Sequence, residues 1–435
     1  MKYINEKIKD GVNLHLIIND NFKTDFTVVF LSVPLEKEYV TKNALIPAVI
    51  KDGSTSFPNY KKLTEELEMM YGASFDCGID KNGDNLILKF YIETINDNYL
   101  PKENDNINKS IKILLDLICN PLIENNAFKK EYVDLEKKNL ELLINAQKDD
   151  KNIYAFEKCI NIMYKNSGFG LSKYGKIEDL AQITEQNLYE QYKKLISEAK
   201  IDIFVSGNFE QEKISKEVKE NEFIQKLNPR QEKINTNHYK NEIKEKIEKP
   251  EEMTEDMNVA QGKLVIGLDI LPNDFDDFRF IAIMYNAIFG GGVNSKLFQI
   301  VREKESLAYT AKSEYISQKN NIFIRCGIEC ENFEKTTNLI KKLLEDMKAG
   351  NFTEDDLKKA KEYIGSGIDA IEAEQDTQII YKFGQELSKL PLTTEEYKAN
   401  IQKVTKEDIV KFANLVQINT IYFLRNGGKN ADNWK

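Results

Sequence analysis

The sequence predicts an α+β fold built from two homologous halves, each a mainly antiparallel sheet covered by helices. The length of 435 residues is enough for two or three domains with a sizeable core. The same order of strands and helices occurs twice along the chain, which indicates an internal duplication. A charged stretch without a repeating apolar face, residues 228–257, separates the two occurrences. We therefore expect domains at 1–227 and 258–435, joined by this linker.

The first half begins with a strand and two helices and continues into a hairpin. In the helix predicted at Tyr60–Tyr71, Leu63, Leu67 and Met70 recur at helical spacing. Asn82-Gly83 is a typical two-residue hairpin turn. The other elements expected here are the strand Asp25–Val33, the helix Asn43–Ile50, and the hairpin strands Phe75–Ile79 and Leu86–Glu93.

The second half repeats this order, and long helices and a closing strand end each half. Thr353 is a predicted N-cap followed by acidic residues, which suit the positive end of the helix dipole. Thr184 and Thr405 begin two further helices with similar sequences, one in each half. The remaining expected elements are the strand Lys263–Ile270, the helices Phe278–Phe289 and Lys296–Glu305, the hairpin strands Ala308–Tyr315 and Ile322–Glu329, and the closing strands Ile201–Gly207 and Thr420–Leu424.

Composition excludes several classes of function. The formal net charge of −10 argues against a nucleic-acid partner, because phosphate binding needs a basic surface. No run approaches the roughly 18 apolar residues of a membrane-spanning helix, and Met1–Lys7 lacks the apolar region of a secretory leader. The five cysteines are odd in number and form no C-x-x-C, which disfavours disulfides and a thiolate zinc site. We expect a cytoplasmic protein without membrane or nucleic-acid partners.

The chain contains only two histidines, which nearly removes histidine-dependent chemistry. His15 and His238 lie in different halves, whereas hydrolytic zinc sites use two or three histidines close together. His15 is in an alternating strand pattern and is expected on its polar face, while His238 lies in a Lys-rich segment expected to face solvent. Neither has a serine or cysteine in an elbow-like context, so a catalytic triad is not expected.

Gly290, Gly291 and Gly292 form a glycine-rich turn between two predicted helices. Their order does not match the phosphate-binding pattern G-x-x-x-x-G-K-[ST], and a helix rather than a strand precedes them, so a nucleotide site is disfavoured. Two interpretations stay open. The turn is either a plain helix-to-helix connection or a place where bare backbone approaches a ligand or closes a cavity.

Arg302 follows this turn and is one of only five arginines among 61 basic residues. A planar, permanently charged fork is useful for recognising a carbonyl or a carboxylate. The competing interpretation is a helix-surface ion pair with Glu303 or Glu305. On the residues alone, the ion pair is slightly favoured.

The stretch Gly290–Phe298, followed by Arg302-Glu303-Lys304 and Leu307-Ala308-Tyr309, resembles the C-terminal half of the insulinase, pitrilysin and mitochondrial-processing-peptidase family. These proteins are the inverzincins, whose zinc motif is H-x-x-E-H. The resemblance covers essentially the whole chain, including the duplication. It implies a bowl or half-clamshell in which Arg302 and Tyr309 bind the substrate backbone and the glycine turn is a cavity or hinge loop.

The first half departs from the family at the zinc motif. Aligning on Gly53-Ser54 places Ala44, Pro47 and Ala48 where the family has His, Glu and His. The family's third ligand, a glutamate in a later helix, falls around Glu136–Leu143. A lone glutamate would not hold catalytic zinc, so the comparison implies no metal in this chain and no peptidase activity of its own.

Within the family, the chain best resembles the YmfF-like group, the non-catalytic members of bacterial inverzincin pairs, in Asp25–Gly53, Tyr71–Ala73 and Asp149–Lys151. The resemblance implies a non-catalytic subunit of a heterodimeric zinc metallopeptidase that binds peptide while an H-x-x-E-H partner supplies the zinc. It also implies a link to peptide processing or to modification of translation elongation factor P. Two alternatives stay open, a structural scaffold subunit and a stand-alone peptide-binding protein. The charge of −10 is compatible with basic peptides as substrates.

Overall fold

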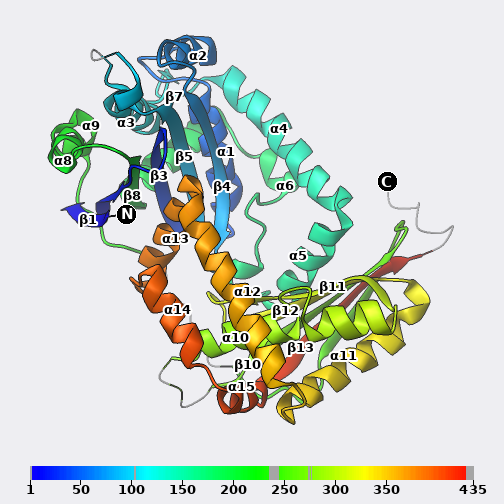
Figure 1. The fold of residues 1–435 in the computed structure, drawn as a ribbon. Coiled ribbons are helices and arrows are strands. Elements are labelled where there is room, and N and C mark those ends of the chain that lie inside the picture. The colour runs from blue at the N-terminus through cyan, green and yellow to red at the C-terminus, as the bar shows by residue number, and fades with distance from the viewer. Residues whose placement is uncertain (1, 102–103, 235–243, 273–274, 276, 428–435) are drawn as a thin grey trace. The chain divides into compact units, whose positions relative to one another are not determined.

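The chain forms two compact units in the structure, a computed structural model that describes residues 2–101, 104–234, 244–272, 275 and 277–427 (Figure 1). Unit 1 comprises Met1–Ala146, Ser167–Asn235 and Gln375–Ile380. Unit 2 comprises Gln147–Asn166, Thr236–Glu374 and Tyr381–Lys435. His238 lies outside the described residues.

Unit 1 contains a six-stranded sheet with the order β1-β2-β8-β3-β5-β4 and a separate two-stranded hairpin, β6-β7. The strands are β1 (Lys2–Lys9), β2 (Val12–Ile18), β3 (Thr24–Pro34), β4 (Ser74–Asn82), β5 (Asn85–Ile95), β6 (Ile123–Glu124), β7 (Ala127–Phe128) and β8 (Lys200–Gly207). The helices of this part of the chain are α1 (Val40–Lys51), α2 (Tyr60–Met69), α3 (Asn106–Cys119), α4 (Lys130–Asp149), α6 (Ile177–Leu180), α7 (Glu185–Glu198), α8 (Gln211–Glu220) and α9 (Glu222–Lys226).

Unit 2 contains a five-stranded sheet with the order β11-β12-β10-β13-β9. The strands are β9 (Glu251–Met257), β10 (Gly262–Ile270), β11 (Ala308–Ile316), β12 (Asn321–Ile328) and β13 (Val416–Asn426). The helices are α5 (Lys151–Met163), α10 (Arg279–Phe289), η4 (Leu297–Lys304), α11 (Phe333–Lys348), α12 (Glu354–Ala373), α13 (Gln375–Ser388), α14 (Thr394–Lys403) and α15 (Lys406–Ala413), of which α13 begins in the segment assigned to unit 1.

The two sheets share one arrangement of strands. In unit 1, β3 lies between β5 and β8, and in unit 2, β10 lies between β12 and β13, with antiparallel pairing throughout. A hairpin partner follows in each case, β4 beside β5 and β11 beside β12. Each closing strand, β8 or β13, also pairs in parallel with an earlier strand, β2 or β9. This repeated topology confirms the α+β class and the internal duplication.

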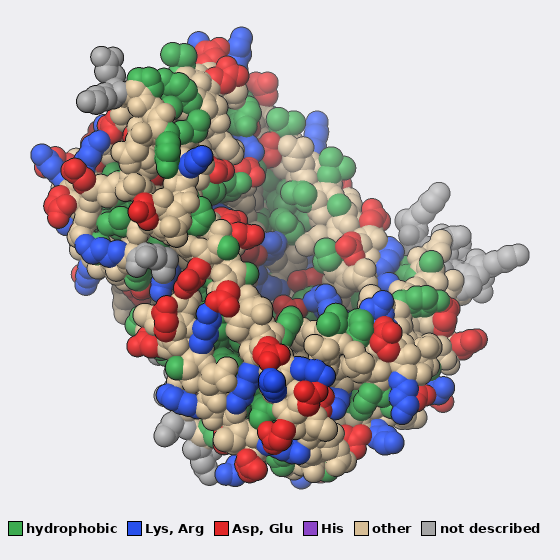
Figure 2. All heavy atoms as spheres, viewed as in Figure 1, with side chains coloured by type: hydrophobic (Ala, Val, Ile, Leu, Met, Phe, Trp, Pro, Cys, Tyr) green, Lys and Arg blue, Asp and Glu red, His purple; other side chains and the backbone are tan. Residues whose placement is uncertain are grey.

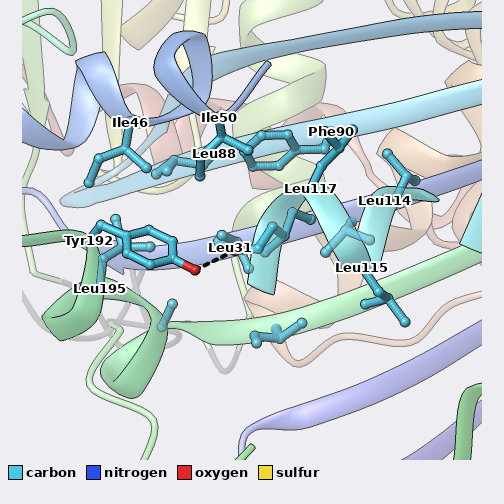
Figure 3. Packing of buried hydrophobic residues seen from close by; sticks show 14 of the residues in the cluster. Leu31, Ile46, Ile50, Leu88, Phe90, Leu114, Leu115, Leu117, Tyr192 and Leu195 are labelled. Carbon is cyan, nitrogen blue, oxygen red and sulfur yellow. Dashed lines mark hydrogen bonds between the residues drawn. The ribbon is translucent and has the colours of Figure 1, made fainter. Parts of the chain in front are cut away.

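The core of unit 1 lies between its sheet and the helices α1 and α3 (Figure 3). Ile46 of α1 and Leu117 of α3 pack with Leu88 of β5, and all three side chains are fully buried. Tyr192 of α7 enters the same layer, and its hydroxyl donates a 2.8 Å hydrogen bond to the carbonyl of Ile118. The polar group in this apolar layer is therefore satisfied.

In unit 2, helices cover both faces of the sheet (Figure 1). Leu264, Ile266 and Leu268 of β10 point into the cluster formed with α10, α11 and α15. The opposite face receives α5, where a side chain on Gly267 would approach within 2.7 Å of the sulfur of Met163. The absence of a Cβ at this position lets α5 lie close to the strand.

Two segments differ from the predicted division of the chain. Glu251–Met257, predicted as part of the charged linker, forms the edge strand β9, whose backbone pairs with β13 while most of its side chains face solvent. A charged edge strand is typical of sheets that avoid further pairing, and it has no apolar face for a pattern to reveal. The helix α5, placed by sequence in the domain 1–227, contacts β10 and β13 of unit 2. The other proposed boundaries stay a prediction.

His15 lies on the polar side of its strand, but that side is buried rather than open to solvent. Its side chain is fully buried, with Nε2 2.9 Å from Oδ1 of Asp202 and Nδ1 2.9 Å from the hydroxyl of Tyr3. Lys200 contacts the same carboxylate at 2.6 Å. The alternation of β2 is correct, but a parallel neighbour, β8, supplies polar partners on what looked like the solvent side.

Acidic and basic side chains are interspersed over the face shown in Figure 2, so the excess negative charge is not gathered into one patch on that face. The five cysteines are free thiols. In the described part of the chain, no helix is both long and apolar enough to cross a membrane.

Candidate functional site

Arg302 lies on a short π-helix, η4, where the sequence predicts an α-helix. The backbone amide of Glu305 donates to the carbonyl of Ile300 at 2.9 Å, which is the five-residue spacing of a π-helix. Over so few turns, the apolar positions fit either type of helix, so the sequence pattern does not separate them. π-helical turns are rare, and they are found frequently at functional sites.

The guanidinium of Arg302 is stacked on the ring of Phe298, with 4.6 Å between Cζ and the ring centroid. Its Nε lies 3.6 Å from Oε1 of Glu303, and the two side chains are 43 % and 53 % exposed. This is the surface ion pair that the sequence suggested as the competing interpretation. At this distance and exposure it is worth little, and it leaves the guanidinium able to donate to another ligand.

Tyr309 is the extra residue of a β-bulge between β11 and β12. Ala308 pairs with Ile328 and Thr310 with the next residue, Gly327, so Tyr309 has no opposite partner. Bulges re-aim side chains and are frequent next to active sites. Tyr309 is 60 % exposed, and its hydroxyl donates a 2.8 Å hydrogen bond to Glu329. This bond to a carboxylate raises the pKa of Tyr309.

A cavity of about 390 Å³ lies beside η4, and all its lining residues belong to unit 2. The side chains that give it chemical character come from η4 and three strands: Arg302, Phe298, Lys263, Thr310, Lys312 and Arg325. Tyr309 is not among the lining residues, so the structure brings Arg302 to the cavity but leaves Tyr309 beside it, against Glu329.

Three of the cavity's cations stand on one face of the sheet. Lys312 pairs directly with Arg325 across β11 and β12, and Arg325 pairs with Val265, two residues from Lys263 on β10. One Nη of Arg325 donates to Glu314 at 2.8 Å, and Lys263 donates to the amide oxygen of Gln261 at 2.9 Å. Burial lowers the pKa of Lys263, an effect that Asp150 opposes from a distance.

No motif in the sequence marks Lys263 and Lys312 as site residues. Alternation along each strand places Lys263 on the face of Val265 and Lys312 on the face of Thr310, which is a usable signal. It does not show which strands are neighbours, and only the register of the folded sheet brings these side chains together.

The glycine turn supports the site through close backbone packing. The carbonyl of Gly290 accepts a 2.8 Å hydrogen bond from the amide of Ser313 on β11, and a Cβ on Gly290 would collide with Ser313 and Leu297. Gly291 lies against Ala287, and Gly292 against the ring of Tyr363. Bare backbone is therefore needed here for packing within the chain, while the approach to a ligand or cavity and the hinge role stay predictions.

The positions aligned with the family's zinc motif lie on α1. Ala44 and Pro47 are buried, Ala48 is partly buried, and the carbonyl of Pro47 accepts a hydrogen bond from the thiol of Cys77 at 3.3 Å. Burial raises the pKa of Cys77 to about 12, so this thiol is not a reactive thiolate at neutral pH.

Glu136 of α4 lies near the end of α1. Burial and, to a smaller extent, the charge of Glu136 raise the pKa of Asp52 to about 6, against the opposing charge of Lys51. The charge of Glu136 thus acts on the residue that follows α1, and which residue aligns with the family's third metal ligand stays a prediction. Among the residues that the structure describes, no three His, Cys, Asp or Glu side chains form a group suited to holding a metal ion.

Comparison with known proteins identifies the family. Residues 182–364 match the family described as "Peptidase M16 inactive domain". Over 429 residues, 98 % of this chain and 99 % of the relative, the sequence is 33 % identical to the "Probable inactive metalloprotease YmfF" of Bacillus subtilis. The chain belongs to the M16 peptidase family. Both designations confirm the prediction of a non-catalytic M16 member. The alignment of Ala44, Pro47 and Ala48 with the zinc motif stays a prediction.

Two further comparisons place this M16 chain among its relatives. A crystal structure of a conserved protein from Enterococcus faecalis V583 superposes with a TM-score of 0.89 at 28 % identity, covering 99 % of this chain and 100 % of that one. The "Uncharacterized zinc protease YmfH" of Bacillus subtilis is 22 % identical over 220 residues, 50 % of this chain and 48 % of that protein. The M16 relatives thus include proteins named as inactive and as zinc proteases within one organism.

Proposed function

We propose that this chain is the peptide-holding, non-catalytic subunit of a heterodimeric zinc metallopeptidase, with Arg302 and Tyr309 binding the substrate and a partner supplying an H-x-x-E-H zinc site. The observation that carries the proposal is the position of Arg302 on the edge of a cavity. The π-helix, the positive φ of Ser306 and the bulge at Tyr309 concentrate unusual backbone in one short stretch. Irregular backbone of these kinds is frequent at functional sites, where it directs side chains towards a ligand.

The geometry of Arg302 suits recognition of a peptide. Its stacking on Phe298 holds the guanidinium plane in place, so less conformational entropy is lost when a ligand binds. A planar fork donates two parallel hydrogen bonds to one carboxylate or to neighbouring carbonyls. Tyr309 adds an exposed phenol. Its hydroxyl donates to Glu329, which is also exposed, so a ligand can take the place of Glu329 as the acceptor.

The division of labour follows from the chemistry. M16 cleavage needs zinc to polarise the scissile carbonyl and activate water, which the residues on α1 do not support. A chain that binds peptide without cleaving it can contribute to proteolysis when a zinc-bearing relative cleaves the peptide that it holds. Bacillus subtilis contains relatives named as inactive and as zinc proteases, as such a pair requires. The five free thiols suit a reducing, cytoplasmic location for the pair.

The structural-scaffold alternative has one observation in its favour. Arg302 and Tyr309 both have acidic neighbours within the chain, Glu303 and Glu329, and each contact is exposed. A scaffold would keep these contacts and bind no peptide. The same experiment separates the two functions.

Reconstitution tests the proposal directly. The chain, the H-x-x-E-H subunit from the same organism and an equimolar mixture are assayed with internally quenched peptides. We expect the mixture to exceed the sum of the separate rates. The Arg302→Lys and Tyr309→Phe double variant should lose about tenfold or more of this gain, because hydrogen bonds to a charged group are removed.

A matched control makes the same chemical changes elsewhere. Arg425→Lys alters an exposed arginine paired with Asp256, and Tyr99→Phe alters an exposed tyrosine of unit 1. This double variant should keep the gain, and both variants should melt near the wild-type temperature. A zinc subunit that is equally active alone and does not co-elute with the chain would refute the proposal.

A further inference from the structure

The cavity beside η4 is strongly basic in a chain whose net charge is −10. Four cationic side chains line it, Lys263, Arg302, Lys312 and Arg325, and no Asp or Glu belongs to its described lining. The cationic character comes from three strands and a helix that are distant in sequence, so it is a product of the fold. Global composition gives no sign of it.

This arrangement is unfavourable without a counter-charge. Lys312 and Arg325 are directly opposite on neighbouring strands, where like charges destabilise a sheet. Neither Lys263 nor Lys312 has a carboxylate within ion-pair distance among the described residues. Lys263 is half-buried, and burial lowers its pKa, which reflects the cost of keeping it charged there.

Arg325 has a donor that no described residue satisfies. One of its Nη atoms donates to Glu314, and its guanidinium lies 4.4 Å from the ring centroid of Phe156. Its Nε is buried and has no hydrogen-bond partner in the described structure. Unsatisfied buried donors are uncommon in folded proteins, and a functional role or a bound ion is among the explanations for them.

We propose that this cavity binds a carboxylate of the peptide, so that the subunit selects acidic rather than basic substrates. The inference rests on the proposed peptide-holding function and names the substrate class for it. The carboxylate comes from an Asp or Glu side chain or from the C-terminus of the peptide, since both present the same acceptor oxygens. It corrects the expectation from net charge, because the local field is set by the four nearby cations rather than by distant acids.

The size and lining of the cavity fit this substrate class. A volume of about 390 Å³ lies within the range of pockets that enclose small ligands. Arg302 and Phe298 line it from η4, and Lys312 and Arg325 line it from β11 and β12. A peptide whose backbone is held by Arg302 can therefore place an acidic group against the strand cations.

Four fluorescein-labelled peptides test the inference with the full-length chain. Three have an amidated C-terminus and differ only at one central residue, Glu, Gln or Lys. The fourth is the Gln peptide with a free C-terminal carboxylate. Fluorescence anisotropy should give about tenfold tighter binding for the Glu peptide or for the free-acid peptide than for the amidated Gln peptide. The peptide that binds more tightly, the Glu peptide or the free-acid peptide, identifies the source of the carboxylate.

Charge variants locate the site. Lys312→Gln should lower the preference for the acidic peptide severalfold, and Lys263→Gln provides a second variant on another strand. Lys341→Gln, on the exposed surface of α11, removes the same charge away from the cavity and should leave the preference unchanged. If Lys341→Gln lowered the preference for the acidic peptide as much as Lys312→Gln does, the effect of charge would be non-specific and the inference would be overturned.

The outcomes separate this inference from the proposed function. Equal binding of the three amidated peptides with no gain from the free carboxylate, tighter binding of the Lys peptide, or no binding at all would overturn acidic selection. Reconstitution with the zinc subunit would still decide the proposed function independently. Synergy there with no carboxylate preference here refutes only the inference.

Discussion

At the scale of single residues, Asp202 is the clearest case of a side chain whose role depends on its neighbours. It is fully buried on β8 between Lys200 and His15. Burial alone would raise its pKa, but the charges and hydrogen bonds of Lys200 and His15 more than offset this and lower it to about 2. Because the pKa is lower in the folded state, this carboxylate stabilises the fold at pH values above 3.8, the ordinary pKa of an aspartate.

That stability should be lost as the pH falls from about 4 towards 2. Asp202→Asn should cost about 3–5 kcal/mol at neutral pH, since Lys200 would be left buried without its partner. It should also flatten this part of the pH profile. Urea unfolding at several pH values measures both effects. Asp256→Asn, which breaks an exposed pair with Arg425, is the control and should change stability little. A profile that is the same in wild type and Asp202→Asn would contradict the assignment.

At the scale of elements, the glycine turn after α10 is fixed by packing against β11. Gly290→Ala should destabilise the chain by about 1–3 kcal/mol, because a Cβ would collide with Ser313 and Leu297. Gly367→Ala, in the exposed middle of α12 with open space around it, should instead stabilise by about 0.5–1 kcal/mol. If this explanation holds, thermal unfolding should show a lower melting temperature for Gly290→Ala and a higher one for Gly367→Ala than for the wild type. A neutral Gly290→Ala would favour a loose, hinge-like turn.

At the scale of the whole molecule, the missing zinc ligands decide what the chain does alone. Purified protein should retain no stoichiometric zinc after dialysis and should not cleave peptides, because the predicted motif positions on α1, Ala44, Pro47 and Ala48, offer no metal ligands. Metal analysis beside a fluorogenic assay measures both. One tightly held zinc per chain, with cleavage that a chelator abolishes, would contradict this.

The sequence by itself determined the features that depend on local interactions. Thr184, Thr353 and Thr405 each form the capping box that begins its helix, because the bonds involved span only three residues. The duplicated order of elements and the loss of the zinc motif are likewise written along the chain.

Only the tertiary structure decided what depends on which strands are neighbours. It buried His15 against Asp202, gave η4 its π-helical form, and turned a charged segment into the edge strand β9. It also set Lys312 opposite Arg325 and beside Lys263 in one cavity. Alternation assigns each side chain to a face, but the electrostatic environment of a face is fixed by register across strands far apart in sequence.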